Sequence, residues 1–312
     1  MRGYLATTDH DWFTFLRARA PLDEVNFWQP SAHGFNAPAG TPFLFKLKAP
    51  HYAIGGFGIF ARYEAATPKL AWEAFGEKNG APSFGAMTQR IGRYTRESSG
   101  PVHRIGCIMV TTPVFFADAD WIEQPRDWKP NVVSGAGHDL TAGEGRRVWE
   151  ACIEHAARLT RADLLPAVPT AGEPELPRYG EPQLVRPRLG QGTFRVAVTG
   201  AYDSACAVSR EHSLPVLEAA HIRPYADEGA HDVANGLLLR ADIHRLFDAG
   251  YVTVTPDQRF VVSRRLAQEW ENGKAYYEME GRSIAVPRRV ADRPDPELLR
   301  WHNEHVFERT AA

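Results

Sequence analysis

The sequence predicts an α+β protein of two domains, and three observations support this prediction. The chain has 312 residues, more than one small hydrophobic core usually serves. Strand-like and helix-like segments follow each other in mixed order in the first half, which is typical of an α+β domain. Residues 166–187 are rich in proline and lack apolar periodicity, which predicts a linker. We therefore expect one domain over residues 1–165 and another over residues 188–312.

The composition limits the classes of function only weakly. The chain has 36 basic and 38 acidic residues and a formal net charge of −2, so contact with nucleic acid would require a local cationic surface. Cys107, Cys152 and Cys206 are isolated, which argues against a disulfide framework and a cysteine-rich zinc site. There is no signal-peptide core and no apolar run of membrane-spanning length. We therefore expect a soluble, cytoplasmic protein with no membrane partner.

The first half is expected to form a small, strongly curved sheet with helices. Its β-branched and aromatic runs predict strands, and glycines at 55, 56 and 58 predict bulges or close backbone contacts. Thr141 and Glu144 have the spacing of a capping box, which predicts a helix start. The expected elements are strands at 41–48 and 52–63 joined by a tight turn, helices at 68–76 and 84–94, a strand at 104–110, and a helix from 141 to about 158.

The second half is expected to combine helices and short strands around one core. The expected elements are a helix at 190–202, a strand at 215–222, a polar loop, a helix at 241–249, paired strands at 251–255 and 259–263, and a closing helix at 297–309. Six apolar residues are predicted to form the core: Leu237, Leu239, Leu246, Phe247, Tyr251 and Val254.

The most informative stretch, residues 217–252, reads LEAAHIRPYADEGAHDVANGLLLRADIHRLFDAGYV. Its AAHI, NGL and HRLFD segments closely resemble the HNH (ββα-metal) endonuclease family, and in particular a subgroup of modification-dependent restriction enzymes. The resemblance covers about residues 188–265. It implies a ββα-metal nuclease domain that hydrolyses phosphodiester bonds with one divalent metal ion.

The resemblance implies a role for three residues at the family's spacing. His221 is the general base, which takes a proton from the attacking water near neutral pH. Asn235, fourteen positions later, orients this base and pins the loop through hydrogen bonds. His244, nine positions further, is a metal ligand.

Asp248 follows His244 by four positions, and residues i and i+4 share one face of a helix. The imidazole and the carboxylate are therefore expected to converge on one ion. Such a site suits Mg²⁺ or Mn²⁺ foremost, with Ni²⁺ or Zn²⁺ as alternatives. No structural zinc is expected, because Cys206 is alone whereas many HNH domains have paired CxxC knuckles. His302 and His305 lack a third ligand and are interpreted as residues of a solvated helix end.

One position departs from the family pattern. Many members have Asp or His directly before the base as a further metal ligand, but here this residue is Ala220. Glu218 lies two residues earlier and, in a strand, points to the same side as Ala220. Either Glu218 supplies the missing oxygen, directly or through water, or the ion has two protein ligands completed by water and phosphate. The sequence leaves both alternatives open.

Two arginines near these residues are candidates for binding phosphate. Arg223 and Arg245 have guanidinium groups, which pair with phosphate in a fork geometry. The alternative is a structural ion pair with Asp227 or Asp242.

Residues 39–76 are similar to a second family in the order of their elements. A hydrophobic strand, a strand with Gly-x-Gly and a tryptophan-bearing helix follow one another as in PUA-superfamily domains such as EVE and ASCH. The resemblance implies a PUA-like curved β-barrel with helices over residues 1–165. Relatives in this superfamily read modified bases by flipping them into an aromatic pocket.

A flipped base needs flat surfaces on both sides and hydrogen-bonding groups at its edge. Trp28 is expected on a loop, because polar residues and Pro30 surround it, and residues 133–140 are expected to form a flexible polar loop. The candidate pocket residues are Trp28, Phe57 and Trp72 as walls, with Gln29, Ser31 and Asn36 at the base edge. The alternative is that the aromatic residues form the core of the barrel.

Together, these observations predict a modification-dependent, type IV-like DNA restriction endonuclease. Its partner is double-stranded DNA with modified bases, and a 5-substituted cytosine is the expected base. One HNH site cuts one strand, so a double-strand break requires a homodimer or two recruitment events. Two alternatives remain: an HNH nuclease whose first domain binds RNA or protein, and a catalytically silent DNA-binding protein.

Overall fold

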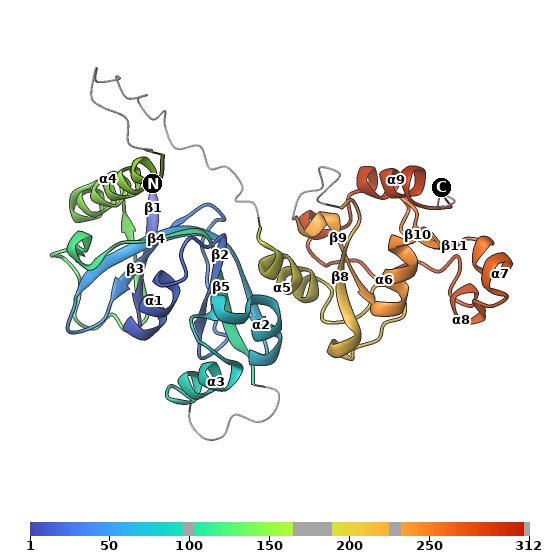
Figure 1. Cartoon of the computed structure of the whole chain (residues 1–312), viewed down its shortest axis with the longest axis horizontal. Helices are drawn as coiled ribbons and strands as arrows, with labels where there is room; N and C mark the ends of the chain where they lie inside the picture. Colours follow the sequence, from blue (N-terminus) through green and yellow to red (C-terminus); the bar gives the residue numbers. More distant parts are fainter. Residues whose placement is uncertain (96–102, 165–188, 225–231, 309–312) are drawn as a thin grey trace, which may run out of the picture. The chain divides into compact units, whose positions relative to one another are not determined.

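The computed structural model describes residues 1–95, 103–164, 189–224 and 232–308. The chain divides into two compact units, Met1–Pro187 and Arg188–Ala312, which are drawn in Figure 1 and treated separately below. The linker predicted at 166–187 lies outside the described residues. Within those residues, no helix is both long and apolar enough to cross a membrane.

The first unit is a mixed α+β structure, as the sequence predicted. Its strands are β1 (Arg2–Thr8), β2 (Glu24–Gln29), β3 (Pro42–Leu47), β4 (Ala53–Ala66), β5 (Ile105–Phe115), β6 (Ile122–Glu123) and β7 (Gly135–Asp139). Its helices are α1 (His10–Arg17), α2 (Pro68–Phe75), α3 (Phe84–Gly92) and α4 (Gly143–Leu164), with short 3₁₀ turns η1 (Gly76–Asn79) and η2 (Asp118–Asp120).

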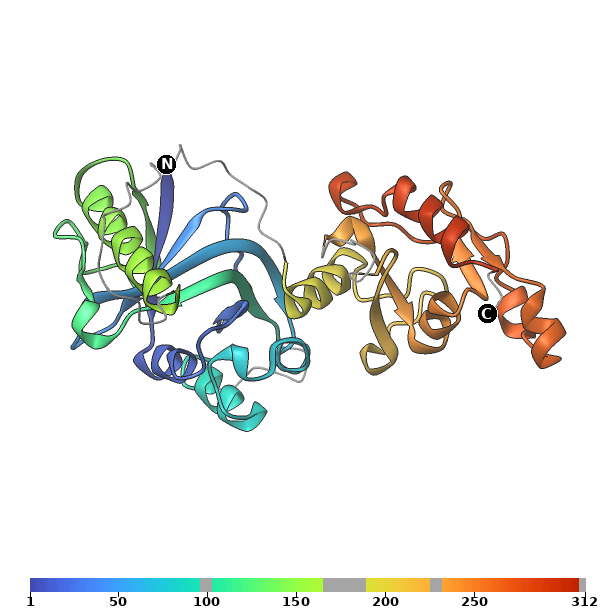
Figure 2. The same cartoon turned by 45° about the horizontal axis from the view of Figure 1, so that its top comes forward.

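The seven strands form one sheet in the order β2-β5-β4-β3-β1-β7, with β6 beside β4. Among the strand pairs of the described residues in this unit, β1 and β3 are parallel and the others are antiparallel. The long strands β4 and β5 curve strongly (Figure 2), and β4 shifts register twice against β5. Glycine is required in β4, because a Cβ on Gly56 would collide with the Val114 carbonyl oxygen and one on Gly58 with the Val110 side chain.

The predicted barrel differs from the observed sheet. Its end strands β2 and β7 do not pair with each other in the described part of the chain, so the sheet is curved but open there. The prediction placed the sheet's first strand at residue 41, whereas β1 pairs in parallel with β3 and presents its other edge to β7. The strands β1 and β7 thus extend one side of the sheet without closing it. The resemblance to PUA domains therefore stays a prediction.

Helices cover both faces of this sheet (Figure 1). Trp12 and Phe13 of α1 pack in one apolar cluster with Phe43 and Phe45 of β3. On the other face, α4 contributes Val148 and Cys152 to a cluster with Leu5, Leu44 and Phe57. Because side chains alternate along a strand, β3 contributes to both clusters and is buried throughout. The core therefore lies in two layers, one on each side of the sheet.

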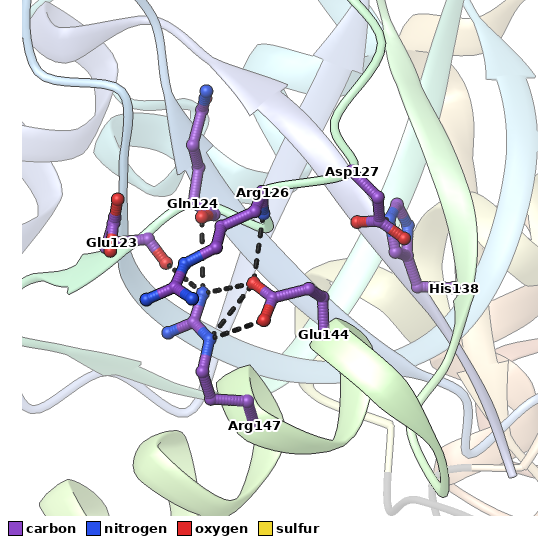
Figure 3. Close-up of polar contacts among 7 residues, drawn as sticks. All are labelled: Glu123, Gln124, Arg126, Asp127, His138, Glu144 and Arg147. Atoms are coloured by element: carbon purple, nitrogen blue, oxygen red, sulfur yellow. Dashed lines mark hydrogen bonds and ion pairs between the residues drawn. The ribbon is translucent and has the colours of Figure 1, made fainter.

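The first turn of α4 is held by an ion-pair network (Figure 3). The Arg147 guanidinium donates to the Glu144 carboxylate at 2.8 Å and to the carbonyl oxygens of Glu123 at 3.2 Å and Gln124 at 3.3 Å. The backbone N–H of Arg126 also donates to Glu144, at 2.9 Å. These donors lower the pKa of the Glu144 carboxyl to about 2. The network ties α4 to the segment around β6.

The helix predicted from the capping box is present, but the capping box is not. The backbone N–H of Thr141 donates to Asp139 at 2.9 Å, whereas Glu144 accepts from Arg126 and Arg147. The helix begins at Gly143 and extends to Leu164, beyond the expected end. Arg126, from a separate segment, and Arg147, on the same helix, thus replace the partner that the spacing suggested.

Several strands of the first unit were not predicted. Residues expected as a flexible loop include β7, which pairs antiparallel with β1. Trp28, expected on a loop, lies in β2, where it is opposite Cys107 of β5. The β7 sequence Gly-Ala-Gly-His-Asp has little strand propensity, so pairing with a neighbouring strand determines its conformation.

The second unit contains the helices and strands expected from the sequence, together with a further strand at 236–240 and two further short helices. Its strands are β8 (Leu217–His221), β9 (Gly236–Arg240), β10 (Val252–Val254) and β11 (Phe260–Val262). Its helices are α5 (Gln191–Ala201), α6 (Ala241–Asp248), α7 (Arg265–Trp270), α8 (Lys274–Tyr277) and α9 (Pro296–His305), with 3₁₀ turns η3 (Leu214–Val216), η5 (Val233–Asn235) and η6 (Val290–Asp292).

The strands β8 and β9 pair antiparallel and lead directly into α6, which gives a ββα arrangement. A single apolar cluster holds α5, α6 and both strand pairs together. Of the predicted core residues, Leu237, Leu239, Phe247 and Val254 are buried and Leu246 and Tyr251 are partly buried. The Cys206 thiol is buried in this core and accepts the backbone N–H of Arg240 at 3.3 Å.

Candidate active site

A cavity of about 250 Å³ lies in the second unit, and it brings together three of the residues singled out in the sequence. Its lining consists of His221, Ile222, Pro224, His244, Asp248, His302 and Val306. His221 is the last residue of β8 and Ile222 follows it, while His244 and Asp248 come from α6. His302 lies in α9, and Val306 follows the end of this helix. The cavity is thus formed where the ββα arrangement meets the last helix of the unit.

His221 ends β8 and is opposite Gly236 of β9 in register. Its imidazole lies flat on the Phe194 ring of α5, with ring centroids 3.9 Å apart and an interplanar angle of 8°. Gly236 allows this arrangement, because a Cβ there would lie 2.5 Å from a Val198 methyl group and 3.0 Å from the Phe194 ring. The position of the imidazole therefore depends on close packing between α5 and β9.

Asn235 is almost completely buried and holds the segment that follows His221. Its side-chain amide donates to the carbonyl oxygen of Arg223 and accepts the backbone N–H of the same residue, both at 2.9 Å. Its own carbonyl oxygen accepts the backbone N–H of Ile222 at 2.9 Å. Three hydrogen bonds from one residue therefore fix the two residues directly after His221.

His244 lies between two carboxylates. Its Nε2 is 3.4 Å from Asp248 Oδ2, one helical turn along α6, and its Nδ1 is 2.7 Å from Glu218 Oε2 on β8. Desolvation raises the pKa of the Asp248 carboxyl; the His244 ring opposes this shift and Glu218 adds to it. The two nitrogens of His244 thus have different carboxylate partners on different elements.

The donor set facing the cavity suits a divalent ion held by few protein ligands. His244 offers a nitrogen and Asp248 a carboxylate oxygen, both of which bind such ions. Across the described residues, no group of three or more His, Cys, Asp or Glu side chains is placed to hold a metal. His244 and Asp248 are therefore the residues at this cavity that could hold a divalent ion.

His302 was expected at a solvated helix end, and this expectation is wrong. Its side chain is buried, stacked on the Phe247 ring with centroids 3.6 Å apart. Nε2 is 3.2 Å from the Phe247 carbonyl oxygen, which can only accept, so Nδ1 accepts the Thr253 hydroxyl at 2.9 Å. Burial lowers the pKa of His302 to about 4 although the Phe247 carbonyl opposes the shift. His305 is exposed, as expected, and stacks on Trp301.

The two arginines predicted to bind phosphate do not line the cavity. The Arg223 guanidinium lies over the Trp301 ring, 5.2 Å from its centroid. Arg245 is exposed on α6 beside His244. Asp242, named as an alternative partner, instead pairs with Nε and Nη2 of the Arg240 guanidinium, at 2.6 and 2.7 Å. Asp227 lies outside the described residues, and phosphate binding by the two arginines stays a prediction.

The first unit has a cavity of its own, of about 170 Å³. It is lined by Thr7, Asp9, Trp12, Phe27, Trp28, Gln29, Pro30, Lys48, Tyr94, Val133 and Ser134. Of the six predicted pocket residues, it therefore includes Trp28 and Gln29. Trp28 is held in place by donating its indole N–H to the Asn79 carbonyl oxygen at 3.0 Å.

A polar cluster at this cavity was missed by the sequence reasoning. Asp9 accepts Lys48 Nζ at 2.5 Å and the Tyr94 hydroxyl at 3.0 Å. Burial lowers the pKa of Lys48, but hydrogen bonding and charge attraction to Asp9 outweigh this and raise it overall. The Thr7 hydroxyl and the Trp12 indole N–H, also from lining residues, are buried and have no hydrogen-bond partner in the described structure. No local sequence signal joins these residues, because Thr7 lies in β1 and Trp12 in α1, while the other three lie in separate connecting segments.

The other four predicted pocket residues lie elsewhere. Phe57 is buried on the α4 face of the sheet, where its ring centroid is 5.2 Å from that of Trp149. Trp72 contacts Phe84 near the start of α3. Ser31 and Asn36 follow β2 but do not line the cavity. Strand alternation turns Phe57 away from the α1 face, to which Trp12 and Phe27 of the cavity lining belong.

Comparison with known proteins identifies the segment that forms the candidate active site. Among solved structures, a modification-dependent TagI restriction endonuclease is similar, with 24% identity, a TM-score of 0.27, and coverage of 37% of this chain and 38% of that one. The present chain thus spans well under half the length of that protein. No curated protein matches the chain. Residues 206–255 match the family model of the HNH endonucleases, which generally use a divalent metal ion, and this supports a nuclease role.

Proposed function

We propose that the chain is a metal-dependent DNA endonuclease, with its active site at the cavity of the second unit. The observation that supports this most strongly is that His221, His244 and Asp248 line one cavity inside the segment that matches the HNH endonucleases. The spacing of these residues in the sequence does not by itself require that their side chains lie close together. Their convergence from β8 and α6 provides a base and two metal ligands within one site.

His221 takes the proton from the attacking water. The stack on Phe194 and the end of β8 hold its imidazole in place, while Asn235 fixes the backbone that follows. His244 and Asp248 would hold the divalent ion. When bound, this ion stabilises charge on the phosphate and on the departing 3′ oxygen.

The nuclease role is tested with the full chain, linear DNA and either Mg²⁺ or Mn²⁺. We expect His221→Ala and His244→Ala to abolish cleavage while DNA binding persists. His305→Ala is the matched control, because this histidine is exposed and does not line the cavity. Absence of wild-type cleavage with every metal and DNA tried would favour the silent DNA-binding alternative.

The first unit reads a modified base, and its cavity is the proposed binding site. Trp12, Phe27 and Trp28 provide aromatic surfaces, and Asp9 and Gln29 provide acceptors for the amino group of a base. The unpartnered Thr7 hydroxyl and Trp12 indole N–H are further groups that a bound base could satisfy. A cytosine substituted at its 5 position is the expected ligand, because the apolar rings accommodate the substituent and the acceptors suit the amino group.

Base reading is tested by cleavage of otherwise identical DNAs that contain cytosine, 5-methylcytosine or 5-hydroxymethylcytosine. We expect faster cleavage of a modified DNA and loss of this preference in Trp28→Ala. Trp72→Ala is the matched control, because this tryptophan does not line the cavity. Equal cleavage of all DNAs by the wild type would exclude base reading and favour a first unit that binds RNA or protein. Cleavage of both strands at one locus would call for a homodimer or two recruitment events.

A further inference from the structure

The contacts of Glu218 bear on how the metal ion is held. The sequence suggested Glu218 as a replacement for the metal ligand that many family members have at the position of Ala220. In the structure its carboxylate lies 2.7 Å from Nδ1 of His244, whereas Asp248 lies 3.4 Å from Nε2 of the same ring. The cavity is lined by His244 and Asp248, and Glu218 is not among its lining residues. Glu218 and Asp248 therefore approach the imidazole at different nitrogens.

These positions follow from the ββα arrangement. Residues 218 and 220 share one face of β8, where Ala220 is buried in the apolar cluster that also includes Ile243 and Phe247 of α6. The Glu218 side chain on this face reaches His244 on α6. Asp248 lies four residues after His244 on the helix and meets its other nitrogen. The ring is thus fixed between a strand residue and a helix residue.

A neutral imidazole that donates its one N–H to a carboxylate keeps its lone pair on the other nitrogen. Histidines that bind metals ordinarily donate the N–H of their second ring nitrogen to a carboxylate, a backbone carbonyl or water, which fixes the tautomer and the orientation of the ring. We propose that Glu218 is a positioning residue of this kind: it holds His244 with the proton on Nδ1 and leaves Nε2, on the Asp248 side, to bind the divalent ion. This inference rests on the proposed function, because it concerns a metal ligand of the nuclease site.

One consequence concerns the alternatives that the sequence left open. With Glu218 bound to Nδ1, the ion has two protein ligands, His244 and Asp248, and Ala220 contributes none. Water and phosphate oxygens complete its coordination. The metal therefore binds weakly to the protein alone and more tightly once DNA adds a phosphate.

The first test reads the tautomer without metal or DNA. Long-range ¹H–¹⁵N correlation spectra of the full chain with ¹⁵N-labelled histidine report which ring nitrogen is protonated, and His244→Gln identifies the His244 signals. We expect a protonated Nδ1 in the wild type and a shift toward protonated Nε2 in Glu218→Ala. A wild-type His244 with its proton on Nε2 would overturn the positioning role.

The second test measures Mn²⁺ binding by calorimetry. Loss of a carboxylate that supports a metal-binding histidine typically weakens binding about 10- to 100-fold, which is the effect expected for Glu218→Ala. Glu218→Gln keeps an oxygen that accepts the Nδ1 proton, so it should restore most of the affinity. A metal ligand would behave differently, because replacing its charged oxygen by an amide would weaken binding about as much as alanine does. Equal losses in both variants would therefore contradict the proposal.

Controls separate this inference from the proposed function. Glu280→Ala removes an exposed carboxylate of the same unit and should leave both the tautomer and Mn²⁺ affinity unchanged. Circular dichroism and thermal unfolding verify that each variant is folded. A wild type with Nδ1 protonated and Mn²⁺ bound, but unable to cut any DNA, would overturn the proposed function and leave the role of Glu218 intact.

Discussion

The imidazole of His221 lies parallel to the ring of Phe194, with centroids 3.9 Å apart. Phe194 is buried in the core of the second unit and comes from α5, which precedes β8. His221, the proposed general base, therefore packs directly against a core residue. Packing in the core and the geometry of catalysis are directly linked at this contact.

Phe194→Leu is expected to slow cleavage about 10- to 100-fold, because leucine retains apolar volume but not the flat surface, and small displacements of catalytic groups have effects of that size. Stability should fall by only about 1 to 2 kcal/mol. Single-turnover cleavage and urea unfolding measure the two effects. Phe260→Leu, another buried ring of the same core, should lose comparable stability without the loss of rate. Similar rates for the two variants would argue against a role for the stack.

Asn235→Ala removes two side-chain hydrogen bonds to the backbone of Arg223. We expect a loss of about 2 to 3 kcal/mol in the free energy of unfolding, because these backbone groups lose partners in a largely buried setting. Cleavage should also fall, since the segment after His221 is no longer fixed. Asn303→Ala is the control: it removes a 2.8 Å hydrogen bond to the Val254 carbonyl and should lower stability while the rate per folded molecule persists. A fully active Asn235→Ala would show that cleavage does not require the hydrogen bonds of the Asn235 side chain.

Gly236→Ala is expected to destabilise the protein by about 1 to 3 kcal/mol, because the new Cβ would meet Val198 and the Phe194 ring at 2.5 and 3.0 Å. The displaced ring should also slow cleavage. Gly92→Ala is the matched substitution, since a Cβ at this helical position meets nothing within 4 Å, and it should leave stability unchanged or slightly higher. Thermal unfolding of the two variants provides the comparison, and equal melting temperatures would be inconsistent with close packing at β9.

His302 predicts a dependence of stability on pH. Its pKa is about 4 in the folded protein, against about 6.5 in an unfolded chain. Above pH 6.5 His302 is neutral in both the folded and the unfolded state, so its protonation does not lower the stability of the protein. As the pH falls from 6.5 to 4, only the unfolded state takes up the proton, and the folded state loses up to about 3 kcal/mol of stability.

Urea unfolding of the wild type and of His302→Gln at pH 7.5 and 5.0 measures this effect. The wild type should lose about 2 kcal/mol more than the variant between the two pH values, because only the wild type has the titrating group. His305→Gln, at an exposed position of α9, should follow the wild type. Identical losses for wild type and His302→Gln would show that His302 does not titrate as expected.

The sequence alone determined the features that depend on neighbouring residues. Periodicity and turn residues predicted β3, β4 and the helices α2 to α6. The motif containing His221, Asn235 and His244 lies within one continuous stretch, so its order and spacing were sufficient to indicate the HNH segment that the family comparison supports. Helical register alone also placed His244 and Asp248 on one face of α6.

Only the tertiary structure decided which distant residues meet. The stack of Phe194 under His221, the burial of His302 and the approach of Glu218 to Nδ1 of His244 depend on packing between elements separated along the chain. The cavity of the first unit is a further example, because Asp9 and Tyr94 come from separate parts of the chain and meet only when the sheet has formed. Local propensity does not predict such contacts, because the atoms involved are distant in the sequence and come together only when the chain folds.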